Sequence, residues 1–559
     1  MSDNTSALKV LVKNALESIA AEKGADASKL GEVLFERPRQ ENHGDWATNT
    51  AMKNCKLLGY KPRVLAQEIV SRIGEDGHVA KIEVAGPGFI NFYLSNMWID
   101  ELVKEVLSKG KDYGRADSGH GRKAQVEFVS ANPTGPLHVG HGRGAAVGDV
   151  VGNILAFAGW EVEKEYYVND AGLQINILGR STQARYFELL GHPEKFPMPQ
   201  DSYSGDYVYD VAREIINVHG NEFLDMAPEE SLPFFKEYAS GRILGQIKDV
   251  LSQFGVRFDR FFSEKSLYER KLVPEALKTL EDGGHLYNSD DAVWFRTTDY
   301  GDDKDRVLMR SNGVPTYFTS DIAYHKDKFD RGFDLVIDVW GADHHGYVPR
   351  MKAAVKALGY DPDKFAVLLI QFVNLLRNGK QVRMSKRNDD FVTLEEVLNE
   401  CGIDATRYYF LMRRSDSHLD FDLELAKAQT TENPVYYVQY AHARMCSLLR
   451  KASESGIEMP APEEFDASQI TTAEEKRLFT AIARMPEEVR RAAIDLDPHR
   501  IVSYAYDLST EFHSWYNNSS RILEETGAKR AAHLLMIEVA RTALKNTLAL
   551  IGVSAPERM

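Results

Sequence analysis

The alternation of strand, helix and strand between residues 124 and 168 constrains the fold more than any other feature of this sequence. AQVEFVS (residues 124–130) and EVEKEYYV (161–168) have the composition of strands, and HGRGAAVGDVVGNILAFAG (141–159) has that of a helix. Two strands joined through a helix form a β-α-β unit, in which the strands lie parallel in one sheet. The sequence therefore predicts an α/β domain built on a parallel sheet.

The sheet is expected to continue beyond this unit. Apolar runs at FDLVIDVWG (residues 333–341) and FAVLLIQFVNL (365–375) are typical of further strands, and a helical segment, MKAAVKALG, follows the first of them. The simplest arrangement is a parallel sheet that helical insertions interrupt at roughly residues 180–285.

The N-terminal residues have a different pattern. Residues 5–23 carry apolar side chains at three- and four-residue spacing, which predicts an amphipathic helix that ends at Gly24. In KIEVAGPGFINFYLS (residues 81–95), alternating apolar positions on either side of a Gly-Pro-Gly turn predict two strands. These features indicate a small mixed α/β unit that ends near residue 108.

Beyond about residue 420 the strand signals vanish. Asn433 and Pro434 are typical of a helix start, with proline at the first helical position before VYYVQYAHARMCSLLRKA. Later segments, such as EKRLFTAIARMPEEVRRAAI, also have helical periodicity. The C-terminal part is therefore expected to be a helical bundle.

Composition excludes several classes of protein. The chain has 559 residues, enough for three or four folded units, and its three cysteines (Cys55, Cys401 and Cys446) include no C-x-x-C pair, which argues against a disulfide framework and a thiolate zinc site. Neither a secretory signal nor a stretch of 18 apolar residues is found, so we expect a cytoplasmic protein with no membrane partner. The net charge of -15 lowers the expectation of a nucleic-acid partner only modestly, because basic residues can gather on one face.

The first candidate site lies between the strand at residues 124–130 and the following helix. Its sequence runs from Ala131 to His141 and includes the pattern His138-Val139-Gly140-His141. A reacting ATP phosphate needs hydrogen-bond donors, close approach of the backbone and the positive end of a helix dipole, and this loop offers all three. The alternative is a surface loop with two incidental histidines.

The second candidate site is Arg383-Met384-Ser385-Lys386-Arg387, in a polar loop about 240 residues later. Expulsion of pyrophosphate develops negative charge, which calls for ammonium or guanidinium groups opposite the histidines. Lys386 is the predicted residue for this role. Taken alone, the segment would be an ordinary solvated basic loop.

Together the two motifs resemble the HIGH and KMSKS signatures of the class I aminoacyl-tRNA synthetases. The stretches VEFVSANPTGPLHVGH, YFTSDIAYH, VWGADHHGY and LALIGVSAPERM resemble the arginyl-tRNA synthetases in particular. The chain departs from the signatures in HVGH and in Arg383, which replaces the family's first lysine with a different geometry. The resemblance implies ATP and Mg2+ as cofactors, L-arginine and tRNA(Arg) as substrates, and an arginyl-adenylate intermediate that forms with release of pyrophosphate.

The resemblance also implies an architecture. We expect an α/β fold with a Rossmann-like parallel-sheet catalytic domain at residues 109–420. An N-terminal α+β domain (1–108) would contact the tRNA elbow, and a C-terminal all-α helical bundle (421–559) would bind the anticodon. The family further implies a monomer, no DNA partner, and tRNA binding before arginine is activated.

The family motifs assign roles to individual residues. The catalytic residues are expected to be His138, His141 and Lys386. The ATP-binding residues are expected to be Pro133, Gly135, Gly140, Gly341, Asp343, His344, Met384 and Ser385. The arginine-binding residues are expected to be Glu127, Asn132, Tyr317 and Asp321.

Arginine recognition has a physical requirement of its own. A planar guanidinium needs a carboxylate, because a neutral pocket would leave the charge buried and unpaired. Glu127 and Asp321 are the candidates, and Tyr317 would share a helical face with Asp321 if that segment is helical. Without the resemblance, Asp321 would be read as a helix cap or a surface acid.

The tRNA contacts are expected in the terminal domains. The candidates are Trp46, Tyr436, Tyr440, Arg444 and Met559. Aromatic rings and guanidinium groups can stack on splayed bases. Aromatic residues on a helix, and Trp46 itself, are equally compatible with a hydrophobic core.

Asp343-His344-His345 could also hold a metal ion, because a D-H-H triplet is a signature of one phosphoesterase family. That family requires further aspartate motifs near the N-terminus, which this sequence lacks, so we expect no protein-held metal and no structural zinc. Three other functions remain open. They are a nucleotidylyltransferase of the HxGH type, a non-catalytic RNA-binding relative, and a synthetase for cysteine or glutamate.

Overall fold

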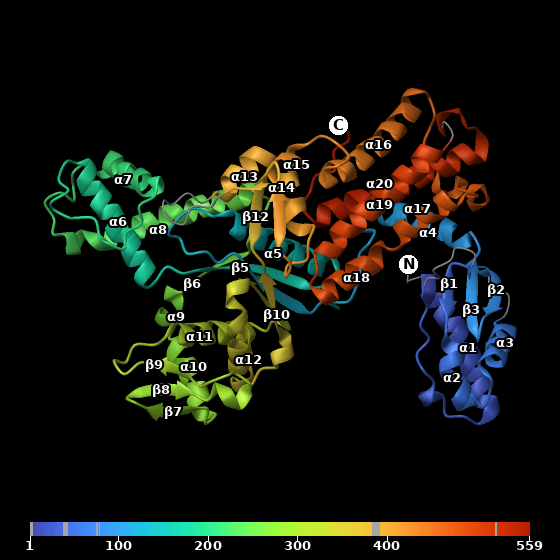
Figure 1. The fold of residues 1–559 in the computed structure, drawn as a ribbon, viewed down its shortest axis with the longest axis horizontal. Helices are drawn as coiled ribbons and strands as arrows, with labels where there is room; N and C mark the ends of the chain where they lie inside the picture. The colour runs from blue at the N-terminus through green and yellow to red at the C-terminus, as the bar shows by residue number, and fades with distance from the viewer. Residues whose placement is uncertain are drawn as a thin grey trace.

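The computed structural model describes residues 4–36, 38, 43–73, 77, 79–382, 392–519 and 522–559. Figure 1 shows an elongated molecule in which a central sheet lies between a helical arm at one end and two terminal units at the other. No helix in these described ranges combines the length and the apolar character needed to cross a bilayer.

The central sheet has five parallel strands. They are β4 (Lys123–Glu127), β5 (Glu161–Val168), β6 (Arg260–Ser263), β10 (Leu335–Gly341) and β11 (Phe365–Ile370). Their spatial order is β11-β10-β4-β5-β6, so the order reverses between β4 and β10. The predicted α/β class is confirmed, and the reversal marks the place where sheets of this kind bind ligands, at the carboxyl ends of the strands.

The strand expected at residues 365–375 is divided in two. β11 ends at Ile370, and β12 (Val373–Arg377) joins a second sheet with β13 (Lys380–Gln381) and β14 (Leu419–Asp422). Gln371 and Phe372 lie between the two strands. One apolar run therefore serves two sheets, a division that hydrophobicity alone does not reveal.

Helix α5 (Val139–Phe157) connects β4 with β5 and lies very close to the sheet. A side chain at Gly148 would overlap the Phe128 ring, and one at Gly142 would overlap Leu394. Most of its residues are buried, so the glycines allow the helix to pack between the sheet and the helices that follow.

Two insertions interrupt the sheet. The first forms the helical arm of Figure 1, with α6 (Leu173–Leu189), α7 (Asp206–His219) and α8 (Pro228–Gln253). The second follows β6 and contains α9 (Lys265–Glu269), α10 (Leu272–Asp282), β7 (Leu286–Ser289), β8 (Ala292–Phe295), β9 (Arg306–Met309) and α11 (Tyr317–Asp330). The antiparallel sheet β7-β8-β9 was not predicted. α12 (Val348–Ala357) then connects β10 with β11.

The N-terminal unit packs three helices on an antiparallel sheet. Its elements are α1 (Asn4–Lys23), β1 (Trp46–Thr48), α2 (Thr50–Leu58), α3 (Pro62–Arg72), β2 (Val79–Ala85) and β3 (Phe89–Leu94). The predicted helix and the two predicted strands are present, and these elements share a hydrophobic core of their own. The next helix, α4 (Met97–Lys109), packs instead against the C-terminal helices.

The C-terminal region is helical, as predicted. Beyond β14 it contains α15 (Leu423–Lys427), α16 (Pro434–Glu454), α17 (Ala473–Ala483), α18 (Met485–Asp495), α19 (His499–Asn518) and α20 (Gly527–Leu550). Two further helices, α13 (Leu394–Cys401) and α14 (Ile403–Leu411), precede β14. Asn433 is the N-cap of α16, but its amide donates to the carbonyls of Ala426 and Ala428 instead of capping the helix. This residue thus joins α16 to the preceding loop.

Candidate active site

A cavity of about 600 Å³ lies at the carboxyl ends of β4 and β10, where the strand order reverses. Many of the residues predicted for the site line it. They are Glu127, Asn132, His138, Gly140, His141, Asp321, Gly341, Asp343 and His344. The structure therefore brings together residues from the loop after β4, from α11 and from the end of β10.

His138 and His141 form a matched pair at the start of α5. His138 Nδ1 accepts hydrogen bonds from the backbone N–H groups of Gly140 (3.1 Å) and His141 (3.4 Å). His141 Nδ1 accepts from the backbone N–H of His138 at 3.3 Å, and the two rings stack with centroids 3.6 Å apart. Because each Nδ1 is an acceptor, the proton of each neutral ring is on Nε2.

Both imidazoles are neutral near pH 7. Burial lowers the pKa of His138, and burial together with His138 lowers that of His141 to about 3. Two Nε2–H donors therefore line the cavity at the positive end of the α5 dipole. Such a pair can donate to an anionic oxygen without carrying a charge of its own.

Asp321, in α11, also lines the cavity. The Tyr347 hydroxyl donates to Asp321 Oδ2, and burial raises the pKa of the carboxyl group. A buried carboxylate of this kind is stabilised by an incoming cation. This part of the cavity is thus suited to a guanidinium or ammonium group.

Glu127 has partners within the protein. Its Oε1 accepts from the Ser130 hydroxyl at 2.8 Å, and its Oε2 accepts from Lys328 Nζ at 2.6 Å. Lys328 also donates to Asp338 Oδ1 at 2.6 Å. The carboxylate of Glu127 is therefore less available to a substrate than that of Asp321.

Glu264 is a further acid of this region that the sequence analysis missed. It is buried directly after β6, and burial, with Asp321 and Asp170 nearby, raises its pKa to about 7. Since β6 is only four residues long, no predicted strand pointed to it. A cation placed between Glu264 and Asp321 would relieve their mutual repulsion.

Other residues of the cavity were also missed. They are Tyr167, Asn169, Trp340, Tyr347, Gln371 and Phe372, among others. Their position carries a signal, because Asn169 directly follows the predicted strand at residues 161–168 and Trp340 is next to the end of another. A search of strand ends would have found both.

Several predicted residues do not line the cavity. Tyr317 is 64% exposed at the start of α11, while Pro133 and Gly135 lie in the loop before α5. That loop is held by the helical arm, because Tyr207 donates through its hydroxyl to the Thr134 carbonyl at 2.8 Å. Met384, Ser385 and Lys386, with Arg383, lie outside the described residues.

No group of three or more His, Cys, Asp or Glu side chains that could hold a metal ion occurs within the described parts of the chain. Asp343 and His344 are largely exposed at the mouth of the cavity, with Asp343 Oδ2 3.6 Å from His344 Nε2. The triplet that begins at Asp343 thus forms no metal cluster with other described residues.

The predicted tRNA-binding residues of α16 cluster on one side of the bundle. The rings of Tyr436 and Tyr440 stack 5.9 Å apart, and the Arg444 guanidinium lies over the rings of Tyr440 (4.6 Å) and Tyr516 (4.7 Å). Arg444 also donates to the Tyr440 hydroxyl at 2.7 Å. We call Tyr436, Tyr440 and Arg444 the α16 ladder; it combines aromatic faces with a cation.

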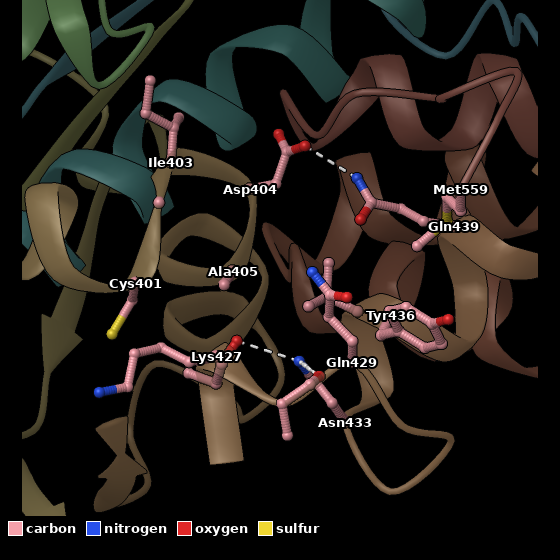
Figure 2. Close-up of a pocket in the computed structure, with 14 residues that line it drawn as sticks. Cys401, Ile403, Asp404, Ala405, Lys427, Gln429, Asn433, Tyr436, Gln439 and Met559 are labelled. Atoms are coloured by element: carbon pink, nitrogen blue, oxygen red, sulfur yellow. Dashed lines mark hydrogen bonds between the residues drawn. The ribbon is translucent and has the colours of Figure 1, made fainter. Parts of the chain in front are cut away.

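Figure 2 shows a second cavity, of about 520 Å³, between α14, α15 and α16. Tyr436 and the C-terminal Met559 line it, and Asp404 accepts a hydrogen bond from Gln439 at 2.8 Å. It lacks the histidine pair and the buried acids, so we assign the chemistry to the first cavity. In the N-terminal unit, Trp46 pairs with Phe92 in the sheet and packs against the hydrophobic core.

Three family sequence models match the chain. "Arginyl tRNA synthetase N terminal domain" matches residues 6–94, "tRNA synthetases class I (R), catalytic domain" matches 102–430, and "DALR anticodon binding domain" matches 438–559. The second match covers more than half of the chain and includes the cavity.

Relatives that are similar over almost the whole chain include two arginine–tRNA ligases. An arginine–tRNA ligase of Syntrophotalea carbinolica is 51% identical over 99% of both chains, and arginine–tRNA ligase 1 of Halalkalibacterium halodurans is 49% identical over 95% of both. The solved arginyl-tRNA synthetase of Thermus thermophilus has a similar fold, with a TM-score of 0.75 and 23% identity over 99% of both chains.

Proposed function

The chain belongs to the arginyl-tRNA synthetase family, and from that premise we propose which of its residues carry each part of the reaction. The protein ligates L-arginine to tRNA(Arg) at the expense of ATP through an arginyl-adenylate, with release of AMP and pyrophosphate. Membership of this family also removes the nucleotidylyltransferase and the other amino acids from consideration.

Arginine is proposed to bind with its guanidinium between Asp321 and Glu264. The observation that supports this is a pair of acids, the buried Glu264 and the partly buried Asp321, whose raised pKa values a cation would lower. Tyr347 orients Asp321 through its hydroxyl. Asn132 would hold the α-amino group or carboxylate, and Glu127 and Tyr317 complete the proposed arginine site at greater distance from the charge.

ATP is proposed to bind across the start of α5, with its α-phosphate against His138 and His141. The two neutral Nε2–H donors would stabilise the charge that develops as the arginine carboxylate attacks phosphorus and pyrophosphate leaves. Gly140 keeps the backbone open, since a side chain there would crowd the His138 ring at 3.0 Å. Pro133, Gly135, Gly341, Asp343 and His344 would border the nucleotide.

Lys386, with Met384 and Ser385, is proposed to reach the leaving pyrophosphate from the basic loop. Mg2+ is proposed to be held mainly by the substrate phosphates and water. Bound there, Mg2+ would neutralise charge on the phosphates. In the second step the terminal ribose hydroxyl of tRNA(Arg) attacks the adenylate carbonyl.

The stacked histidine pair is the observation that carries the proposed active site, and His141→Ala tests it. Loss of a donor made for the transition state should lower kcat for ATP–pyrophosphate exchange by about 100-fold or more. The KM for arginine should change little. His192→Ala, which changes a partly exposed histidine after α6 in the helical arm, is the control. An equal loss of arginine binding would contradict the assignment.

The tRNA is proposed to bind the α16 ladder of Tyr436, Tyr440 and Arg444 beside Met559, with Trp46 and the N-terminal unit near the elbow. Tyr440→Ala should weaken tRNA(Arg) binding by about 1–3 kcal/mol, the range of one base stacked on an aromatic ring. Filter binding would measure it, with Tyr209→Ala on α7 as the control. Unchanged affinity would leave the ladder as core packing.

We propose further that the enzyme is a cytoplasmic monomer that binds tRNA before it activates arginine. ATP–pyrophosphate exchange with each of the 20 amino acids, measured with and without tRNA, tests whether arginine activation requires bound tRNA. Arginine-dependent exchange without tRNA would contradict it, and sedimentation at several concentrations tests the monomer.

A further inference from the structure

Three side chains on one face of α11 connect the cleft with the sheet beneath it. Asp321, His325 and Lys328 are spaced four and three residues apart, so they lie on the same side of the helix. Asp321 lines the cavity, whereas His325 and Lys328 are 4% and 0% exposed. The proposed acid of the arginine site and its buried neighbours are therefore parts of one helix face.

The Lys328 ammonium lies between two strands. Its Nζ donates to Glu127 Oε2 and Asp338 Oδ1, each at 2.6 Å. Glu127 ends β4 and Asp338 lies in β10, the two strands between which the order reverses. An ammonium group is stable in such a place only when it is fully paired, and here two carboxylates share it.

His325 is the second cation of this network. Its Nδ1 is 2.7 Å from the Asp321 carbonyl oxygen, which can only accept, so Nδ1 carries a proton. Its Nε2 is 2.8 Å from Asp338 Oδ2. Burial alone would raise the pKa of Asp338, but Lys328 and His325 together outweigh it and hold that pKa at about 2. Nε2 thus faces a carboxylate that also accepts from Lys328, so the geometry at Nε2 is that of a donor, and we take the ring as protonated on both nitrogens.

These charges balance except at one residue. The cations Lys328 and His325 match the anions Glu127 and Asp338, which leaves the Asp321 carboxylate. No ion pair to Asp321 occurs among the described residues, and its recorded donor, Tyr347, is neutral. The network thus leaves the charge of Asp321 uncompensated, and Glu264 is the second acid beside it.

We propose that the Lys328–Asp338–His325 network is a positioning device that neutralises its own carboxylates, so that Asp321, with Glu264 beside it, is left to receive the guanidinium. The inference rests on the proposed function, in which Asp321 receives arginine. If the charges of the network did not cancel, a further anion or a repelling cation would lie beneath Asp321. Either one would displace the guanidinium. Arginine's carboxylate would then lie out of line with the α-phosphate.

A cycle of charge-matched variants tests the proposal. His325→Gln removes one cation and Asp338→Asn removes one anion, so each single variant should lose about tenfold or more in kcat/KM for arginine. The double variant H325Q/D338N removes both charges and leaves Lys328 paired with Glu127. It should recover to within about threefold of the wild type, although it carries both changes. Losses that add in the double variant would overturn the proposal.

The controls separate this inference from the proposed arginine site. Lys326→Met changes a lysine of the same helix that pairs with Glu275 and Asp330 at the surface, and should keep arginine kinetics. Asp321→Asn should abolish saturation with arginine. An unchanged KM in D321N would refute the arginine site, whereas loss in D321N without recovery in H325Q/D338N would refute only the network.

A measurement on the wild-type protein does not depend on the folding of any variant. Two-bond 15N–1H NMR correlation of histidine-labelled enzyme, with H325Q to identify the signal, reports which ring nitrogens carry protons. The proposal predicts that both ring nitrogens of His325 carry protons in the folded enzyme. A neutral ring would overturn the charge balance.

Discussion

At the scale of single residues, hydrogen-bond partners decide the charge of the histidines around the cleft. His138 and His141 accept backbone N–H groups at Nδ1 and are neutral donors through Nε2. His325 contacts a carbonyl and a carboxylate instead, which is the basis for its proposed role as a counter-ion. The same side chain can thus take different roles above the sheet and within it.

The raised pKa of Glu264 predicts that arginine binding releases a proton. Its pKa of about 7 in the free enzyme should fall when a guanidinium binds beside it, so arginine binding should release a proton at about pH 6 and none at about pH 8.5. The arginine KM should rise as pH falls below about 7, because the protonated acid attracts the cation less. Calorimetric titration in two buffers of different ionisation enthalpy measures the release.

Glu264→Gln should abolish this proton release. Glu269→Gln, on the exposed side of the short helix α9, is the matched control and should keep it. Release that persists in E264Q would assign the proton to another group, with Asp321 the first candidate since burial raises its pKa as well.

Some residues of the site could be predicted from the sequence, and others could not. His138 and His141 could be predicted because a short motif fixes them between a strand and a helix. Glu264 and Tyr347 could not, since their role depends on contact with Asp321 across 57 and 26 positions of the chain. Pairings of that kind arise from topology and leave no local pattern.

At the scale of elements, the same limit applies to strands. The parallel strands with long apolar runs were predicted, whereas β6, RFFS, and the strands of the hairpin sheet β7-β8-β9 have four residues each and are too short for periodicity to find. Tertiary pairing stabilises such elements. The order of the five parallel strands likewise needed the structure.

The close packing of α5 on β4 gives a prediction about stability. Gly148→Ala would place a methyl group within the Phe128 ring and should cost about 1–3 kcal/mol, the usual range for overpacking. Urea unfolding measures the loss. Gly144→Ala in the same helix meets no atom within 4 Å and should instead gain about 0.5–1 kcal/mol from helix propensity. Equal effects of the two changes would contradict the packing argument.

At the scale of the whole molecule, three parts of the chain meet at one buried arginine. Arg407, in α14, donates to Asp149 of α5 at 2.5 Å, to the Phe254 carbonyl after α8 at 2.9 Å, and to the Ile551 carbonyl after α20 at 3.0 Å. It is 1% exposed. The side chain therefore ties the sheet, the helical arm and the end of the C-terminal bundle together.

Arg407→Met should loosen these three junctions at once while Asp149 keeps its ion pair with Lys164. Because Asp149 stays paired, the loss is that of three buried hydrogen bonds, and it should cost about 2–5 kcal/mol. Hydrogen exchange followed by mass spectrometry should show faster exchange in peptides that cover residues 250–257 and 545–559. Peptides from residues 46–73, in the N-terminal unit with its own core, should exchange as before. Faster exchange confined to α14 would mean that Arg407 stabilises only its own helix, and that the three parts are joined by their apolar contacts.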